Sequence, residues 1–92
     1  MLQLVTTAKF RKDYKRIRKR GFDISLLERV VDSLLREETL DQKYKDHALI
    51  GKYSGFRECH IQSDWLLIYA VSESELILTV TRTGTHADLF NE

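Results

Sequence analysis

The segment from Trp65 to Val71 is almost entirely apolar, and it lies between two segments, Phe56–Gln62 and Leu76–Thr83, in which apolar and polar residues alternate. A continuous apolar run is typical of a strand buried on both faces of a sheet, and alternation is typical of a strand with one solvated face. Because only short polar links separate the three segments, neighbouring strands are expected to pair in antiparallel fashion. The sequence therefore predicts an antiparallel sheet with Trp65–Val71 as its central strand.

Two amphipathic helices are predicted before these strands. Apolar residues recur at helical spacing on one face of Ala8–Arg20, and again in a second segment that starts near Asp23 or Ser25. Gly21 is placed to end the first helix. Ser25 and Glu28 have the spacing of a capping box at the start of the second helix.

Further short strands are expected over residues 2–5 and 47–50. The predicted fold is therefore α+β, with an N-terminal strand and an αα-hairpin packed on a small antiparallel β-sheet, and residues 1–92 are expected to form one domain. The chain contains no run of 18 apolar residues and no signal-peptide pattern, so neither a membrane span nor export is expected. Cys59 is the lone cysteine, which excludes an internal disulfide and favours a reducing cytoplasm.

The formal net charge of +1 conceals a strong asymmetry along the chain. Residues 1–22 carry eight basic side chains and one acidic side chain, Asp13, whereas the remaining 70 residues carry seven basic and thirteen acidic ones. A dense cationic helix face attracts polyanions, because the local field rather than the net charge steers association. The basic residues interpreted as an exposed surface for nucleic acid or an acidic partner, rather than as a solvated helix face alone, are Lys12, Lys15, Arg16, Lys19 and Arg20.

The chain has three histidines, His47, His60 and His86, and all of them lie in polar segments of the C-terminal half. Histidine is the side chain whose charge changes near neutral pH, so histidines beside carboxylates indicate acid–base chemistry. Strand alternation places Glu58 and His60 on one face, and the tight link that contains Asp64 follows the same strand. The sequence therefore predicts a histidine–carboxylate site on the face of the sheet away from the helices.

Two further residues are candidates for the same site. Arg82 ends the last predicted strand within Arg-Thr-Gly-Thr-His and could form a bidentate pair with a phosphate. Phe90 could stack on a base or pin the C-terminal segment to the core, and composition alone favours the second role.

Other kinds of site have little support in the sequence. There is no Gly-rich phosphate loop. Cys59 and His60 are adjacent on a predicted strand and therefore point to opposite faces, which disfavours a Cys–His nucleophile pair. The histidines lack the close spacing of zinc motifs, so we expect neither a metal nor another cofactor.

Four segments resemble the YafQ-type toxins of the RelE/ParE superfamily. These segments are Tyr44–Leu49, Gly55–Ile61, Asp64–Tyr69 and Arg82–Phe90. The resemblance implies a toxin of a type II toxin–antitoxin pair that acts in the cytoplasm as a ribosome-dependent mRNA endonuclease. Its implied partners are the ribosome, mRNA and a cognate antitoxin, with operator DNA bound only through the antitoxin complex.

The resemblance also implies catalytic roles for His47, His60, Asp64 and His86, supported by Phe90. Glu58 stands where relatives more often have aspartate. The expected chemistry is attack of the RNA 2′-hydroxyl on the adjacent phosphate, with one histidine as base and another as acid. The sequence does not say which histidine is which.

Two other kinds of function stay open at this point. ParE-like relatives inhibit DNA gyrase without cleaving RNA, although such an inhibitor has no need of three histidines. A plain RNA-binding domain with incidental histidines is the other alternative. Cleavage of mRNA in a translation extract distinguishes both from the enzyme.

Overall fold

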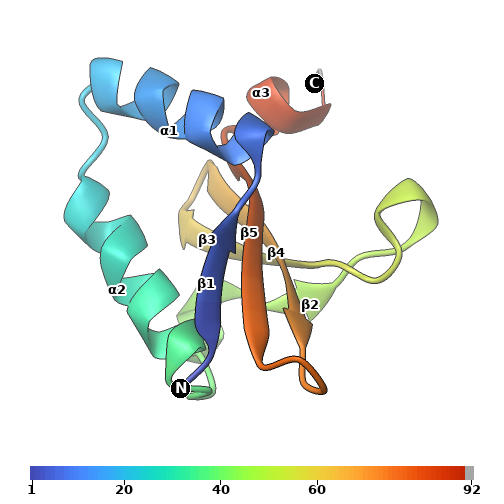
Figure 1. The fold of residues 1–92 in the computed structure, drawn as a ribbon. Coiled ribbons are helices and arrows are strands. Elements are labelled where there is room, and N and C mark those ends of the chain that lie inside the picture. Colours follow the sequence, from blue (N-terminus) through green and yellow to red (C-terminus); the bar gives the residue numbers. More distant parts are fainter. Residues whose placement is uncertain (91–92) are drawn as a thin grey trace.

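The computed structural model describes residues 1–90, and their fold is organised around one five-stranded sheet. Its strands are β1 Gln3–Thr6, β2 His47–Ala48, β3 Arg57–Gln62, β4 Trp65–Ser72 and β5 Ile77–Gly84. The strand order is β1-β5-β4-β3-β2, so the apolar strand β4 is central, as predicted (Figure 1). Strands β2 to β5 pair in antiparallel fashion, whereas β1 lies parallel to β5 at the sheet edge.

The two N-terminal helices, α1 Ala8–Lys19 and α2 Ile24–Leu35, pack on the same side of this sheet (Figure 1). Gly21 adopts a φ of 83°, and the backbone N–H groups of Gly21 and Phe22 donate to the carbonyls of Arg18 and Ile17. This pattern is a Schellman motif, which satisfies carbonyls at the helix end and needs the left-handed backbone that glycine adopts freely. Gly21 therefore ends α1, as the sequence predicts.

The expected capping box at the start of α2 is wrong. Asp23 is the N-cap, and one of its carboxylate oxygens accepts hydrogen bonds from the backbone N–H of Ser25 at 3.1 Å and from the Ser25 hydroxyl at 2.6 Å. A charged oxygen is the stronger acceptor for the exposed N–H groups at a helix start, so Asp23 takes the position that Ser25 was expected to fill.

The last part of the chain also differs from the prediction. The segment expected to run as a strand over 47–50 is a strand for only two residues. The polar segment after β5 forms a short helix, α3 His86–Phe90, which was not expected. Two 3₁₀ turns, η1 Gln42–Tyr44 and η2 Gly51–Tyr53, flank β2.

The main core lies between the sheet and the two long helices. Ile17 of α1, Leu27 of α2 and the strand residues Cys59, Leu67 and Leu78 are at most 2% exposed. The opposite face of the sheet, here called the open face, carries a smaller apolar cluster. Its members are the buried Leu66, Ile68 and Leu89 and the partly buried Leu49, Tyr53, Phe56 and Phe90.

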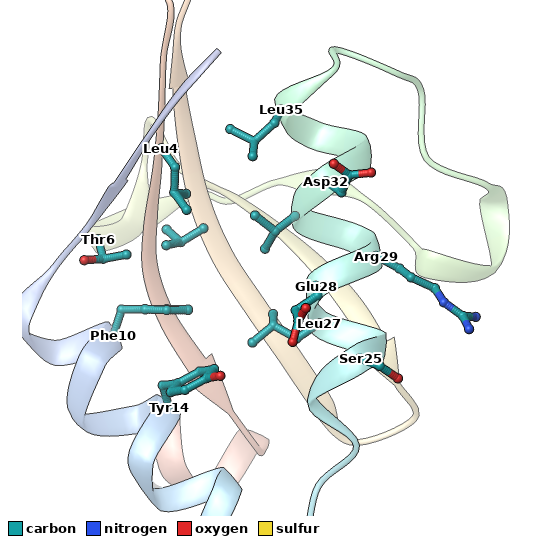
Figure 2. Close-up of a pocket in the computed structure, with 12 residues that line it drawn as sticks. Leu4, Thr6, Phe10, Tyr14, Ser25, Leu27, Glu28, Arg29, Asp32 and Leu35 are labelled. Carbon is teal, nitrogen blue, oxygen red and sulfur yellow. The ribbon is translucent and has the colours of Figure 1, made fainter. Parts of the chain in front are cut away.

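An apolar groove of about 610 Å³ runs between α2 and the edge formed by β1 and α1. Figure 2 shows Leu4, Phe10 and Tyr14 on one wall and Leu27 and Leu35 on the other, all directed into the groove. Because β1 is an edge strand, this groove borders backbone groups without a strand neighbour on that side. Among residues 1–90, no helix is long and apolar enough to cross a membrane.

Candidate catalytic site

The register of the sheet brings the predicted residues together on the open face. His47 pairs with Glu58, Glu58 with Ile68, and Ile68 with Arg82, so these four residues form one row across the strands. Residues paired across neighbouring strands point to the same face, and Ile68 belongs to the open-face cluster. This row therefore places the side chains of His47 and Glu58 on the open face.

The next row contains His60, which pairs with Leu66, and Gly84, which also pairs with Leu66. Helix α3 begins two residues after Gly84, so its first residue, His86, follows this row directly. All three histidines therefore lie on or beside the same face of the sheet.

Glu58 is the centre of one half of this site. The Nε2 atoms of His47 and His60 each lie 3.6 Å from the same oxygen, Oε1 of Glu58. The glutamate is only 6% exposed, so it presents its charge to the two rings rather than to bulk water. The extra methylene of glutamate relative to aspartate thus carries the carboxylate into a position between both histidines.

The contact of Nδ1 shows where the His47 ring carries a hydrogen. Nδ1 lies 2.7 Å from the backbone carbonyl of Lys45. A carbonyl oxygen only accepts, so Nδ1 must carry a hydrogen, and Nε2 is the nitrogen directed to Glu58.

Asp64 and His86 form the other half of the site. One oxygen of Asp64 accepts the backbone N–H of His86 at 3.0 Å and lies 2.7 Å from Nδ1 of the same residue. The backbone hydrogen bond, followed by that of the ring, lowers the pKa of Asp64 below its usual range. An ionised Asp64 accepts a hydrogen from Nδ1 and leaves Nε2 of His86 free.

The two halves meet between His60 and His86. Their ring centroids are 5.9 Å apart, with an angle of 63° between the ring planes. The Phe90 ring lies 6.4 Å from that of His86, and the Tyr53 ring packs edge-on against Phe90 at 5.9 Å. Phe90 is packed with the open-face cluster, as expected of a residue that pins the C-terminal segment, yet it also borders the site.

Local structure at the end of β5 fixes the direction of His86. The Thr85 hydroxyl accepts the backbone N–H of Asp88 at 3.1 Å, and an oxygen of Asp88 accepts the backbone N–H of Thr85 at 3.0 Å. This reciprocal pair is a capping box at the start of α3. A Cβ at Gly84 would lie 2.9 Å from that Asp88 oxygen, so the motif needs glycine there. Thr83 is fully buried and bonded to Trp65, so its hydroxyl is structural.

Arg82 does not present a free guanidinium to the site. Its Nε and an Nη donate to Asp13 of α1 at 2.7 and 3.1 Å, and this pairing raises the pKa of Arg82. Asp13 is 3% exposed and also accepts from Arg16 at 2.9 Å. Sequence reasoning gave Asp13 no role, although a single acidic residue within a basic helix was a usable signal for a buried ion pair.

Four of the five basic residues that were expected to be exposed on α1 are exposed and Arg16 is partly exposed, but two of the five are held in ion pairs within the protein. Arg20 donates to both oxygens of Asp88 at 2.7 and 3.0 Å, and Arg16 is paired with Asp13. The Arg20 hydrogen bond is the main reason why the pKa of Asp88 lies well below its usual range. These two arginines tie α1 to α3 and the sheet. The other three of these residues, Lys12, Lys15 and Lys19, are exposed and take part in no ion pair among residues 1–90.

Cys59 lies on the helix side of β3, away from His60, and burial raises the pKa of its thiol to about 12. Within residues 1–90, no group of three or more His, Cys, Asp or Glu side chains is arranged to hold a metal ion.

The fold and the site together define a small α+β protein with a histidine–carboxylate site on one sheet face and a cationic helix beside it. The family described as the bacterial toxin of type II toxin–antitoxin systems, YafQ, matches residues 2–91. The chain belongs to this YafQ family, which confirms the predicted family, toxin class and enzyme class.

Known relatives cover nearly the whole chain. The mRNA interferase toxin YafQ of Escherichia coli K12 is 38% identical over 85 residues, which are 91% of this chain and 90% of that protein. A metal-bound toxin from Helicobacter pylori is 47% identical, covers 98% of this chain and 100% of its own, and superposes with a TM-score of 0.92. The E. coli DinJ–YafQ complex contains a chain that is 35% identical, with a TM-score of 0.89 and coverage of 98% and 99%.

Proposed function

We propose that this member of the YafQ family acts as a single domain in the cytoplasm, where it cleaves mRNA on the ribosome by histidine acid–base catalysis. The observation that carries this proposal is the pair His60 and His86. Their rings are 5.9 Å apart, and each ring contacts a different carboxylate, Glu58 for one and Asp64 for the other. Two histidines with separate partners can hold opposite protonation states, as a base and an acid must.

The reaction uses a nucleophile that RNA itself carries. One histidine removes the proton of the 2′-hydroxyl, and the 2′-oxygen forms a bond to the adjacent phosphorus. The bond from phosphorus to the 5′-oxygen breaks, and the other histidine gives its proton to that oxygen. The products are a 2′,3′-cyclic phosphate and a 5′-hydroxyl, and each positioned proton transfer contributes about 10²- to 10⁴-fold in rate.

The remaining residues support these two transfers. Glu58 orients the ring of His60 and, through the same oxygen, that of His47, which serves as a third titrating group or as a donor to the phosphate. Arg82 contributes positive potential from the end of the row, although Asp13 shares its charge. Phe90 beside His86 offers a ring face to a base.

Binding to the ribosome is assigned to the exposed lysines of α1. Lys12, Lys15 and Lys19 hold no partner in the described ion pairs, so phosphates of ribosomal RNA can neutralise them by displacing counterions. The small size of the chain favours this dependence, because one short domain has little surface with which to hold mRNA in register by itself.

A cognate antitoxin is the second proposed partner, as in the DinJ–YafQ complex, and it would link the toxin indirectly to operator DNA. The apolar groove between α2 and β1 suits a protein segment, because it offers Leu4 and Leu35 side chains beside an unpaired strand edge (Figure 2). This groove lies on the helix side of the sheet, so a segment seated there does not have to fill the histidine site.

The test is the chemistry of the cleaved ends in a reconstituted translation system. We expect mRNA to be cut only when ribosomes are present, leaving a 2′,3′-cyclic or 3′-phosphate and a 5′-hydroxyl. A 5′-phosphate with a 3′-hydroxyl would indicate activated water instead and would overturn the mechanism. Efficient, site-specific cleavage of naked mRNA at physiological salt would show that the activity does not depend on the ribosome. Growth arrest by gyrase inhibition with intact mRNA would replace the proposed activity altogether.

A further inference from the structure

The residue before His47 is held by a separate group of side chains on the other face of the sheet. Asp46 accepts a short hydrogen bond from the Tyr69 hydroxyl. It also accepts from Nε and Nη2 of Arg57 at 3.4 and 3.1 Å. These donors come from β3 and β4, whereas Asp46 belongs to the segment that enters β2. Three donors from two strands therefore hold one carboxylate.

The strand register shows how this group relates to the open face. Ala48 pairs with Arg57, and His47 pairs with Glu58. Because neighbouring residues of a strand point to opposite faces, Arg57 and Glu58 lie on opposite faces of the sheet. Arg57 contacts Asp46 on the helix side, and Glu58 contacts His47 on the open side. Side chains on both faces of the sheet thus hold the two consecutive residues Asp46 and His47.

Strand β2 has little else to hold it. It is two residues long and lies at the sheet edge, and the hydrogen bond from the Leu49 N–H to the Phe56 carbonyl closes the loop beyond it. So short an edge strand has few ladder hydrogen bonds and low local stability. The position of the His47 ring therefore depends on side-chain contacts rather than on the ladder.

We propose that Asp46, Arg57 and Tyr69 form a clamp that positions His47 for RNA cleavage, an inference that rests on the proposed catalytic role of His47. The clamp fixes the backbone on one side of the ring, while the Lys45 carbonyl fixes Nδ1 and so directs Nε2 at Glu58. The three clamp residues touch no substrate and act through His47.

Both donors of the clamp, Tyr69 and Arg57, stay protonated at neutral pH. Burial, followed by the hydrogen bond to Asp46, raises the pKa of Tyr69, so its hydroxyl stays a donor. The hydrogen bond to Asp46 likewise raises the pKa of Arg57.

Two mild variants test the clamp. Tyr69→Phe removes one hydroxyl and keeps the buried ring, and Asp46→Asn keeps the shape and removes the charge. We expect kcat to fall by about 10- to 10²-fold with KM nearly unchanged, because a displacement of about 1 Å of a reacting group has effects of this size. Glu73→Gln is the matched control, since Glu73 lines the same helix-side pocket without contacting Asp46, and it should retain full activity.

A direct readout separates positioning from general structural damage. In ¹⁵N NMR spectra, Nδ1 of His47 should carry a hydrogen in the unaltered protein, and Asp46→Asn should reduce the population with a hydrogen on Nδ1 while leaving the signals of His86 in place. Repeating Asp46→Asn in a His47→Ala background should give no further loss of activity, since residues acting as one unit are not additive.

The outcomes distinguish the two proposals. If His47→Ala is impaired but both clamp variants fold and cleave with unchanged kcat, the clamp is wrong and the catalytic role of His47 stands. If Asp46→Asn lowers activity equally with and without His47, the effect is structural and the clamp is wrong. If His47→Ala keeps full activity, the catalytic role of His47 is wrong, and the clamp is overturned with it. Should Asp46→Asn fail to fold, Tyr69→Phe decides by the same criteria.

Discussion

Asp64 and His86 are joined by two hydrogen bonds that end on the same carboxylate oxygen, one from the backbone at 3.0 Å and one involving ring Nδ1 at 2.7 Å. The backbone contact holds the first residue of α3, and the ring contact fixes which nitrogen of His86 carries a hydrogen toward Asp64. The orientation and tautomer of the His86 ring thus depend on a single exposed aspartate.

Asp64→Ala should reduce cleavage to an intermediate degree, less than the loss caused by His86→Ala. The ring remains in place without Asp64, but it is free to rotate and to change tautomer. Single-turnover cleavage on programmed ribosomes would measure the loss. Activity equal to that of the unaltered protein would show that Asp64 neither orients nor tunes the ring.

His60→Ala and His86→Ala should each lower the cleavage rate by about 10²-fold or more, as expected for groups that move protons. His47→Ala should be clearly impaired. The double variant of His60 and His86 should be little worse than the poorer single variant, because the two residues act as a unit. Thermal melts are the control, and normally folded variants with near-normal cleavage would contradict the site.

Lys12→Glu, Lys15→Glu and Lys19→Glu together should weaken ribosome binding and reduce its dependence on salt. These lysines are exposed, so each change in the free energy of unfolding should stay within about 0.5 kcal/mol. Arg16 and Arg20 are left intact because their ion pairs hold the fold.

The control for these lysine variants introduces acidic residues away from α1, at the exposed positions Thr39, Gln42 and Ser74. Sedimentation with ribosomes over a salt series measures both sets. The control set changes the net charge by −3 and the lysine set by −6, so about half the loss of binding free energy in the control set would mean that total charge, rather than the α1 surface, governs binding.

Acidification should destabilise the protein in part through Asp88. Its pKa is lowered in the folded state, chiefly by Arg20, so the unfolded chain binds more protons as the pH falls below about 4. Asp88 therefore makes its full contribution to the free energy of unfolding at neutral pH, and this contribution is lost in acid. Asp88→Asn should be less stable than the unaltered protein at pH 7, and the difference should narrow toward pH 2 in urea titrations. The difference in stability between the unaltered protein and Arg20→Gln should likewise narrow toward pH 2. If the free energy of unfolding of all three proteins changes in parallel with pH, the stabilising role of the Arg20–Asp88 pair is wrong.

The Cys59 thiol should be unreactive in the folded protein. Burial raises its pKa to about 12, so very little thiolate exists at pH 8 and the sulfur is also shielded. Alkylation by iodoacetamide should be at least about 10²-fold slower than in urea. Rapid labelling of the native protein would place Cys59 at an accessible position.

Much of the architecture follows from local pattern. The apolar run of β4 is diagnostic because only a central strand buries both faces, and Gly21 ends α1 because a left-handed residue is needed there. Alternation along β3 assigned Glu58 and His60 to one face and Cys59 to the other, and the structure agrees.

Contacts between residues far apart in the sequence could not be predicted from local sequence pattern. The parallel pairing of β1 with β5, the Asp13–Arg82 ion pair and the grip of Arg57 on Asp46 each join segments that only the folded chain brings together. A charge pattern shows that a helix is basic, but it does not show which arginines are already neutralised within the protein. The same limit explains why Arg16 and Arg20 were interpreted as free surface charges.

The parallel pairing of β1 with β5 sets an order of events during synthesis. The Thr7 hydroxyl reaches the Thr81 carbonyl across 74 positions of the chain, and β1 meets no other strand in the sheet. A nascent chain that has not yet produced β5 leaves its first strand unpaired and lacks His86, which follows immediately. An unfinished copy therefore lacks both the strand that pairs with β1 and the last histidine of the histidine–carboxylate site.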